Sequence, residues 1–305
     1  MTPTSLVSLY TYAVALLTTA LVSFAAGAVL IRASSLFQLI DRPRPDRWST
    51  RAVPRGGGVA VLAACSVGYI FAPRHFQGVL AWGPCAVAII GLLDDRYSLT
   101  PLLKFLLQGA VTAVVVFTAH ITIRISASAL VNTVASFLWI IAMTNAFNFI
   151  DNMDGLCSGV TVIISAIQAI ILAIRGLTVE SLAFAIIGTS FLAFLSFNKA
   201  PARLYLGDCG SLFAGFVLST LIISCPAVPV RESVSILTFL LLTFGVPVFD
   251  LCLVVITRSR MKRPFWRGGR DHTSHRLVAL GFPERTVVAV LWFLNAISGS
   301  LAIFV

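Results

Sequence analysis

Charged residues are scarce in this 305-residue sequence: they make up 11% of it, whereas hydrophobic residues make up 58%. A soluble domain of this size needs charged side chains over much of its surface, so the composition excludes one. Alternating apolar stretches, which are typical of a membrane β-barrel, are also missing, because the apolar runs are continuous. We therefore predict an all-α, polytopic integral membrane protein that forms a single domain over residues 1–305.

Cysteine and histidine are few as well, with six and four residues. The cysteines are scattered through apolar runs, without the spacing of a metal site or of a disulfide framework, so we interpret them as small core residues. Basic residues do not precede the first apolar run, Leu6 to Ile31, and this run is too long for the apolar region of a signal peptide. We expect it to remain as a membrane span.

About 20 mostly apolar residues cross the hydrocarbon core as a helix. The sequence contains ten such runs, some of them shorter, at 6–31, 57–73, 78–93, 101–119, 127–147, 157–174, 178–197, 211–225, 233–257 and 286–304. The ninth is the longest, and Gly245 and Pro247 mark the point at which we expect it to tilt or break. An even number of spans places both termini on the same side of the membrane.

Basic residues are distributed unequally between the two sides. All 22 lysines and arginines except Arg74, Arg124, Arg175 and Arg231 fall in loops that follow odd-numbered spans. Because basic loops stay in the cytoplasm, we expect these loops inside and both termini extracytoplasmic. Most carboxylates follow the same partition, so the net charge of +10 belongs to one membrane face and does not indicate nucleic-acid binding. Carboxylates and arginines on one face suit a metal-assisted site for a phosphorylated substrate.

The stretch from Thr144 to Gly155 follows an apolar run and contains no basic residue. It spaces two amides and two carboxylates three residues apart: Asn145, Asn148, Asp151 and Asp154. On a continuing helix this spacing keeps the four side chains on one slowly drifting face. Charged groups at membrane depth usually mark a functional site, whereas an interfacial anchor is more often Lys, Arg, Trp or Tyr. We therefore expect a functional site here, and a metal ion is the first candidate to neutralise the carboxylates.

The second inner loop begins with adjacent carboxylates, Asp94 and Asp95. Like charges raise one another's pKa, and a divalent cation would relieve the repulsion, with Mg²⁺ or Mn²⁺ favoured by oxygen ligands. Thr100 and Pro101 resemble the N-cap and first residue of the next helix. Lys104 then lies near enough to reach the same site or to extend toward lipid phosphates.

The fourth inner loop places Asp208 between glycines, directly ahead of a span. Amides at a helix N-terminus favour phosphate oxygens, although the same sequence is also an ordinary turn. Tyr205, three residues earlier, offers an aromatic face for a uracil ring, and a tyrosine at the membrane interface is the alternative interpretation.

The first and last inner loops are rich in arginine. Gly56 to Gly58 end the first loop, where they permit either close backbone approach or a flexible connection. The last loop contains His272, His275 and Arg276, which are suited to hold a diphosphate, whereas its arginines alone could bind lipid headgroups.

Taken together, these loops resemble the polyprenyl-phosphate N-acetylhexosamine-1-phosphate transferases, which are glycosyltransferases of family 4. The family includes the enterobacterial and teichoic-acid initiating enzymes and the phospho-N-acetylmuramoyl-pentapeptide translocase. The resemblance covers nearly the whole chain and rests on the order of these segments: Asp41 to Gly58, Asp94-Asp95 with Lys104, Asn145 to Gly155, Gly207 to Ser211, and Arg270 to Arg276. It implies ten spans, an active site on the cytoplasmic face and location in the bacterial inner membrane.

The reaction implied by the resemblance transfers an N-acetylhexosamine-1-phosphate, with GlcNAc-1-phosphate as the main candidate, from a UDP-sugar to polyprenyl (undecaprenyl) phosphate. UMP leaves, and the lipid-linked product initiates a cell-envelope glycan such as a cell-wall polymer or lipopolysaccharide. The expected partners are UDP-N-acetylhexosamine, polyprenyl phosphate and the bilayer, with no nucleic acid, and a homodimer is a possible assembly.

The residue types and positions described above, together with the reaction that the resemblance implies, give the expected site residues. Catalytic roles fall to Asp94, Asp95 and Asp208, and the Mg²⁺ ligands (Mn²⁺ is the alternative metal) are Asp208 and Asp95. The expected substrate-binding residues are Lys104, Asn145, Asn148, Asp151, Asp154, Tyr205, His272, His275 and Arg276. A phosphate monoester has a second pKa of about 6 and is mostly ionised, so a base role for Asp94 rests on family analogy alone.

Departures from the family pattern leave the donor sugar open. The consecutive histidines of the muramoyl-pentapeptide translocase are absent, and Ser274 stands where amino-sugar members often have a histidine. The first loop likewise has Arg47 and Ser49 where relatives often have Lys and His. UDP-FucNAc and UDP-QuiNAc are therefore alternative donors, and UDP-MurNAc-pentapeptide is a further one, against which the absence of the consecutive histidines argues.

Two other classes of membrane protein are weaker alternatives. A CDP-alcohol phosphatidyltransferase requires Ala-Arg three residues after an Asp-Gly pair, which the sequence following Asp154 lacks. An ion-coupled transporter carries its charges near the membrane midplane, whereas here only Asp250 lies within a span, so this alternative is remote.

Overall fold

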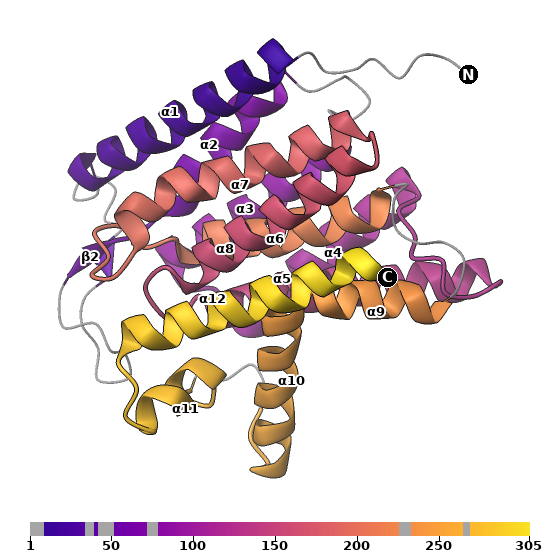
Figure 1. Ribbon diagram of the computed structural model, residues 1–305. Helices are drawn as coiled ribbons and strands as arrows, with labels where there is room; N and C mark the ends of the chain where they lie inside the picture. The colour runs from indigo at the N-terminus through magenta and orange to yellow at the C-terminus, as the bar shows by residue number, and fades with distance from the viewer. Residues whose placement is uncertain (1–8, 34–39, 42–51, 72–78, 226–232, 265–268) are drawn as a thin grey trace.

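The computed structural model describes residues 9–33, 40–41, 52–71, 79–225, 233–264 and 269–305 (Figure 1). These ranges are helical apart from turns, loops and one antiparallel pair formed by β1 (Ile40–Asp41) and β2 (Val53–Pro54). The predicted all-α fold is confirmed except for this pair. The pair places Asp41 opposite Val53, so that Asp41 lies beside the residues that lead into the second helix.

Each predicted span falls on a helix or on a pair of helices. The helices are α1 (Leu9–Ala33), α2 (Gly57–Tyr69), α3 (Val79–Tyr97), α4 (Pro101–Ala119), α5 (Ala129–Ile150), α6 (Leu156–Ile174), α7 (Thr178–Asn198), α8 (Gly207–Ser224), α9 (Ser233–Thr243), α10 (Gly245–Arg260), α11 (Thr273–Ala279) and α12 (Glu284–Leu301), with a final 3-10 turn, η2 (Ala302–Phe304).

Seven of the described helices, α1, α4, α5, α6, α7, α8 and α12, are long and apolar enough to cross a membrane. The number becomes eight if the bent pair α9–α10 is counted as one span. The prediction of about ten spans is therefore supported only in part. Helix α2 is short, with 13 residues, and α3 ends in the charged sequence Asp94-Asp95-Arg96.

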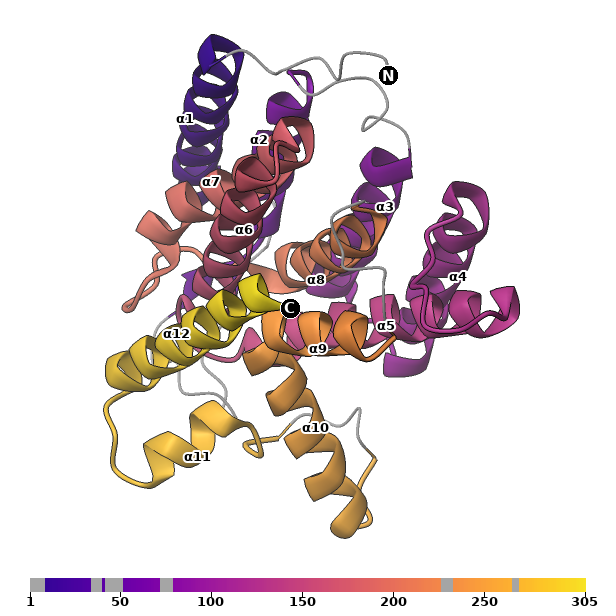
Figure 2. The same ribbon diagram turned by 45° about the vertical axis from the view of Figure 1, so that its right-hand side comes forward.

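The predicted ninth span is broken where its sequence suggested. Helices α9 and α10 meet at 89°, with the break at Phe244, and Pro247 lies in the first turn of α10. Proline is tolerated there because the first helical N–H groups have no intrahelical partner. The N–H of Val246 instead donates to Asn295 Oδ1 of α12 at 3.2 Å. Helix α10 consequently points away from the bundle in both views (Figures 1 and 2).

Helix α8 lies at the centre of the bundle and packs against α2, α3 and α5 (Figure 2). Two glycines let its neighbours approach the first turn closely. A Cβ atom on Gly58 would lie 2.2 Å from the backbone nitrogen of Gly210, and one on Gly91 would lie 2.3 Å from the carbonyl oxygen of Asp208. Small residues of this kind allow backbone contact between membrane helices. The start of α8 is thereby held between α2 and α3.

The described residues of the loops that follow α1, α5, α7 and α10 meet at one end of the bundle, as expected for loops on one side of the membrane. The N–H of Tyr205 donates to Pro54 O at 2.8 Å, which links the fourth loop to the first. Ser274 Oγ donates to Asn152 Oδ1 at 2.8 Å, which links the last loop to the third. In Figure 1 this end, with β2 and α11, lies toward the left, whereas α12 ends toward the right.

The cysteines agree in part with their predicted core position. All six are free thiols, and Cys65, Cys157, Cys209 and Cys225 are buried. Cys85 is partly buried, and Cys252 is exposed on α10, which corrects the expectation for that residue.

Candidate active site

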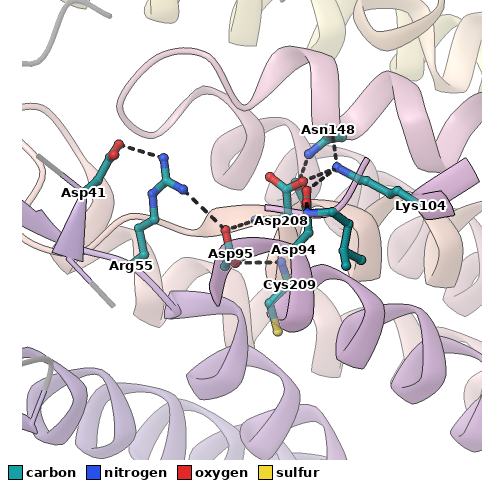
Figure 3. Close-up of polar contacts among 10 residues, drawn as sticks. Asp41, Arg55, Asp94, Asp95, Lys104, Asn148, Asp208 and Cys209 are labelled. Atoms are coloured by element: carbon teal, nitrogen blue, oxygen red, sulfur yellow. Dashed lines mark hydrogen bonds and ion pairs between the residues drawn. The ribbon is translucent and has the colours of Figure 1, made fainter. Parts of the chain in front are cut away.

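Lys104, in the first turn of α4, is surrounded by oxygen atoms from three other helices. Its Nζ donates to Asp94 Oδ2 at 3.0 Å, to Asn148 Oδ1 at 3.3 Å and to Asp208 Oδ2 (Figure 3). These partners come from the end of α3, the last turn of α5 and the first turn of α8. The structure therefore brings four of the predicted site residues together. Of the two positions proposed for Lys104, it occupies the one at the site.

The turn between α3 and α4 explains how Lys104 reaches the carboxylates. Asp94 Oδ1 accepts the N–H of Leu99 at 2.7 Å, which fixes this carboxylate at the start of the turn. Thr100 caps α4 by accepting the N–H of Leu103, and Pro101 is its first residue, both as predicted. A capped helix that starts seven residues after Asp94 places its first turn beside the end of α3.

Asp95 binds the start of α8. Its Oδ1 and Oδ2 accept the backbone N–H groups of Asp208 and Cys209, each at 3.1 Å. The sequence predicted that amides at this helix N-terminus would favour phosphate oxygens, but in the structure these two bind a carboxylate. A negative side chain also complements the positive end of the helix dipole. The described contacts of Asp95 therefore fix the position of Asp208.

Arg55 connects the first inner loop to this site (Figure 3). Its guanidinium lies 2.8 Å from Asp41 Oδ2 and 3.9 Å from Asp95 Oδ1. The side chains of both aspartates are almost completely buried. A buried carboxylate requires a positively charged partner, and the single guanidinium of Arg55 is a partner of both Asp41 and Asp95. Sequence reasoning did not identify Arg55 or Asp41 individually, although both lie in a loop that it marked as charged.

Among the described residues, four carboxylates, those of Asp41, Asp94, Asp95 and Asp208, lie beside Arg55 and Lys104. Burial raises the pKa of Asp95 to about 7, and the negative charge of Asp208 adds to the rise. Burial, together with Asp208, raises the pKa of Asp94 to about 6. Both shifts have the direction expected for carboxylates that are removed from water and crowd one another. The arrangement favours an additional positive charge.

The donors at this site suit a hard cation. Within the described ranges, no group of three or more His, Cys, Asp or Glu side chains forms a ready metal-binding cluster. Oxygens of Asp94, Asn148 and Asp208 nevertheless converge on one ammonium group, and such oxygen ligands are those that Mg²⁺ binds. Asn148 was predicted to bind substrate, and the structure also makes it a candidate ligand. Asp95, a predicted ligand, already accepts a hydrogen bond on each oxygen.

The predicted shared face of Asn145, Asn148, Asp151 and Asp154 is wrong, because α5 ends at Ile150 and only the two asparagines lie on it. Asn152 Nδ2 donates to the carbonyl of Phe149, and Gly155, with a φ of 78°, starts α6 in a new direction. Side-chain capping and a left-handed glycine are ordinary ways to end one helix and begin the next.

The residues of this stretch consequently have separate partners. Asn148 Nδ2 donates to Ser211 Oγ at 3.0 Å and so lies at the Lys104 cluster. Asn145 Nδ2 instead donates to Gln108 Oε1 at 2.9 Å, deeper along α4 and α5. Asp154 accepts the N–H of Ala202 at 2.8 Å, and burial raises the pKa of this carboxyl. Asp151 is the residue that caps α5. A direct substrate contact remains a prediction for these residues.

The fourth loop is held against the beginning of α2. Gly57 N donates to Tyr205 O and Gly58 N to Leu206 O, each at 2.9 Å. Of the two interpretations of the glycine run, close backbone approach is therefore confirmed. Tyr205 is partly exposed at this end of the bundle. Its proposed stacking on uracil remains a prediction.

The last loop folds back onto α10. His272 Nδ1 lies 2.8 Å from Asp250 Oδ2, and Arg276 donates to Thr257 Oγ1 at 2.6 Å. His275 is buried, and this burial, together with the nearby His272 and Arg270, lowers its pKa to about 4. The loop adjoins the end of α5, because the ring of His272 packs edge-on against Phe149 at 5.7 Å. Asp250 was noted in the sequence only as a lone carboxylate within a span.

Buried carboxylates and a lysine gathered at one end of a bundle of membrane-length helices are typical of the functional site of a membrane protein. Comparison with known proteins identifies the family. The model of the family described as Glycosyl transferase family 4 matches residues 78–225, which include the Asp94, Asn148 and Asp208 positions.

Relatives extend the match beyond that segment. A probable undecaprenyl-phosphate N-acetylglucosaminyl 1-phosphate transferase of Bacillus subtilis is 30% identical over 279 residues, which cover 87% of this chain and 76% of that protein. The undecaprenyl-phosphate alpha-N-acetylglucosaminyl 1-phosphate transferase of Thermotoga maritima is 30% identical over 84% of this chain and 78% of its own. The decaprenyl-phosphate N-acetylglucosaminephosphotransferase of Mycobacterium leprae is 28% identical over 90% of this chain and 79% of its own length. The chain therefore belongs to glycosyl transferase family 4 and is a membrane transferase.

Proposed function

We propose that this protein transfers GlcNAc-1-phosphate from UDP-GlcNAc to a polyprenyl phosphate, with release of UMP. The observation that carries the proposal is the convergence of Asp94, Asn148 and Asp208 on Lys104 at the start of α8. The relatives named above support the sugar and the lipid acceptor, because each is named for an N-acetylglucosaminyl or N-acetylglucosamine phosphotransferase that acts on undecaprenyl or decaprenyl phosphate.

In the proposed reaction a phosphate oxygen of the lipid attacks the β-phosphorus of the UDP-sugar. The bond from this phosphorus to the oxygen that bridges the two phosphorus atoms breaks, and the electron pair leaves with UMP. Such transfers depend mainly on positioning and on stabilisation of the phosphate charge. The lipid phosphate is mostly ionised near neutral pH, so the site does not need a strong base.

The residues divide these tasks. Asp208, with oxygens of Asp94 and Asn148, would hold a Mg²⁺ or Mn²⁺ ion, which would neutralise charge on the diphosphate when bound. Lys104 keeps the two carboxylates close together and supplies positive charge to the same place. Asp95 fixes the backbone of Asp208. The last loop, with His272, His275 and Arg276, would hold the diphosphate and sugar of the donor.

We also propose that this end of the bundle faces the cytoplasm of a bacterial inner membrane and that both termini lie outside. The distribution of basic residues supports this orientation. The donor would then reach the site from the cytoplasm, and the acceptor phosphate would reach it from the inner leaflet. The lipid-linked sugar would initiate an envelope glycan.

The test is a product assay. Membranes that contain the protein are incubated with radiolabelled UDP-GlcNAc and undecaprenyl phosphate, and the lipid extract is analysed for GlcNAc linked through a diphosphate. We expect labelled lipid and equimolar UMP, both abolished by chelation of divalent cations and by Asp208→Asn. Labelled UDP-FucNAc, UDP-QuiNAc and UDP-MurNAc-pentapeptide are assayed in parallel. Transfer from one of these donors and none from UDP-GlcNAc would overturn the sugar assignment.

A further inference from the structure

Asp250 is a buried carboxylate that lies outside the Lys104 cluster. It sits on α10, shortly after the break, and is 2% exposed. Both of its oxygens have partners in the last loop: Oδ2 lies 2.8 Å from His272 Nδ1, and Oδ1 accepts the N–H of Thr273 at 2.7 Å. The carboxylate therefore holds both the side chain of His272 and the backbone that follows it.

This contact determines which ring nitrogen of His272 carries the proton. An ionised carboxylate only accepts hydrogen bonds, so the Nδ1 of His272 must donate to it. In a neutral imidazole the other nitrogen, Nε2, then has a free lone pair and acts as an acceptor. The ring is also held by its neighbours, since Phe149 and His275 pack edge-on against it at 5.7 and 5.8 Å. Orientation and proton position are thus both fixed.

We infer that Asp250 is a positioning residue for the transfer reaction. It keeps the proton of His272 on Nδ1 and leaves Nε2 as the ring nitrogen available to the donor substrate. The inference rests on the proposed function, in which the last loop binds the diphosphate and sugar of that donor. Carboxylates that orient a functional imidazole in this way act through the imidazole and do not touch the substrate.

The same loop provides a matched control. Arg258 Nε donates to Asp271 Oδ2 at 2.8 Å, so Asp271, the residue before His272, is also joined to α10. This second contact anchors the loop to α10 without contacting the imidazole. Loss of Asp271 therefore tests anchoring alone, whereas loss of Asp250 tests anchoring and proton position together.

Asp250→Asn separates these two roles. The asparagine Oδ1 can still accept the N–H of Thr273, but its Nδ2 is a donor and requires an unprotonated Nδ1 on His272. The substitution should therefore keep the loop in place and move the imidazole proton to Nε2. Asp271→Asn should leave the proton on Nδ1.

The proton position is measured by ¹⁵N NMR of histidine-labelled protein in lipid nanodiscs at about pH 8. The chain has four histidines, and His272→Gln identifies the signals of His272. We expect the Nδ1-protonated form in the wild type and in Asp271→Asn, and the Nε2-protonated form in Asp250→Asn. An Nε2-protonated wild type, or an Asp250→Asn protein that retains the wild-type form, would overturn the inference.

A kinetic cycle tests whether this matters for turnover. Replacement of a residue that orients a functional imidazole typically costs about 10- to 100-fold, so Asp250→Asn should lower kcat by that factor with little change in KM for UDP-GlcNAc. Addition of Asp250→Asn to His272→Gln should have no further effect on kcat, because both substitutions remove the same hydrogen bond. Multiplicative effects for Asp250 and His272 would contradict the inference. A wild type that makes no lipid-linked product would instead contradict the proposed function, and the NMR result would still stand.

Discussion

Asp95 and Asp208, which are 113 positions apart in the chain, are joined by a hydrogen bond from the backbone N–H of Asp208 to Asp95 Oδ1 at 3.1 Å. The second oxygen of Asp95 accepts the next N–H of α8, so this carboxylate occupies the helix N-terminus. The side chain of Asp208 is then free to contact Lys104. Asp95 holds the backbone of α8, whereas the side chain of Asp208 contacts Lys104. Replacement of Asp95 should therefore have a different consequence from replacement of Asp208.

Asp208→Asn should lower kcat by several orders of magnitude while the protein still inserts and folds. The amide keeps the size and polarity of the side chain but removes the charge that a divalent cation and Lys104 require. Turnover is measured across a Mg²⁺ titration, with Glu180→Gln as the control because Glu180 lies in the first turn of α7, at the opposite end of that helix from the fourth loop. Near-normal turnover with unchanged Mg²⁺ dependence in Asp208→Asn would refute the assignment.

Asp95→Asn should lower stability more than Asp208→Asn does. The new amide can accept only one of the two N–H groups of α8 well, and an unsatisfied buried group costs about 1–3 kcal/mol. Thermal unfolding of both variants in the same detergent should show the larger decrease in Tm for Asp95→Asn. Wild-type stability together with a large loss of Mg²⁺ affinity would show that Asp95 acts as a metal ligand instead.

Arg55→Ala should destabilise the protein strongly, because it leaves the buried side chains of Asp41 and Asp95 without their shared cation. Removal of one partner of a buried ion pair typically costs about 3–5 kcal/mol. Arg55→Lys should recover part of the lost stability and not all of it, because one ammonium group cannot reach both carboxylates as the two guanidinium nitrogens do. The exposed Arg203 in the neighbouring loop is the control, and Arg203→Ala should leave Tm almost unchanged. Equal Tm values for the two alanine variants would contradict the role of Arg55.

Several of these features are local and could be predicted from the sequence. The capping pair Thr100-Pro101 and the break before Pro247 depend on residues within one turn, and the structure contains both. The close approach at Gly58 was predicted from the glycine run itself, although its partner segment was not. The contact of Lys104 with the site was also predicted, since it follows from the position of Lys104 in the first turn of α4.

The remaining features depend on packing between distant segments. The pattern of Asn145 to Asp154 fitted a continuing helix, but Asn152 and Gly155 end α5 before its carboxylates are reached. The bond from α8 to Asp95 and the bond from His272 to Asp250 join residues that no local pattern connects. The sequence therefore predicted the members of the site better than their partners.

The orientation of the site is tested by thiol labelling in a protein without native cysteines. Lys262→Cys lies beyond α10 on the proposed cytoplasmic side, and Arg175→Cys lies between α6 and α7 on the other; both positions are exposed. Ser274 lies in the same loop as Lys262, but it is buried and therefore unsuitable for thiol labelling. An impermeant reagent should label Arg175→Cys in intact cells and Lys262→Cys only in inside-out vesicles. Labelling of Lys262→Cys in intact cells would reverse the topology.

Tyr205→Ala should raise KM for the UDP-sugar if the ring stacks on uracil. Base stacking is worth about 1–3 kcal/mol, and a contact made equally in the ground and transition states changes KM and not kcat. Tyr205→Phe should be mild, and KM for the lipid phosphate should be unchanged in both variants. An unaltered KM for the UDP-sugar in Tyr205→Ala would leave Tyr205 as an interfacial tyrosine.

The bond between Asp95 and the start of α8 also constrains biogenesis. A ribosome that has made Asp41, Arg55 and Asp95 must add more than a hundred further residues before the amides of α8 exist to receive the Asp95 carboxylate. Until then the Asp95 carboxylate lies at the edge of the lipid phase without the two N–H groups that bind it in the folded protein, and a charge at that depth is costly. In the folded protein the first turn of α8 packs closely against glycines on both α2 and α3, so this contact can form only after all three helices have been synthesised. A chain that terminates before residue 207 therefore contains most of the charged residues of the site and none of the helix that joins them, so the site can be completed only after α8 has been made.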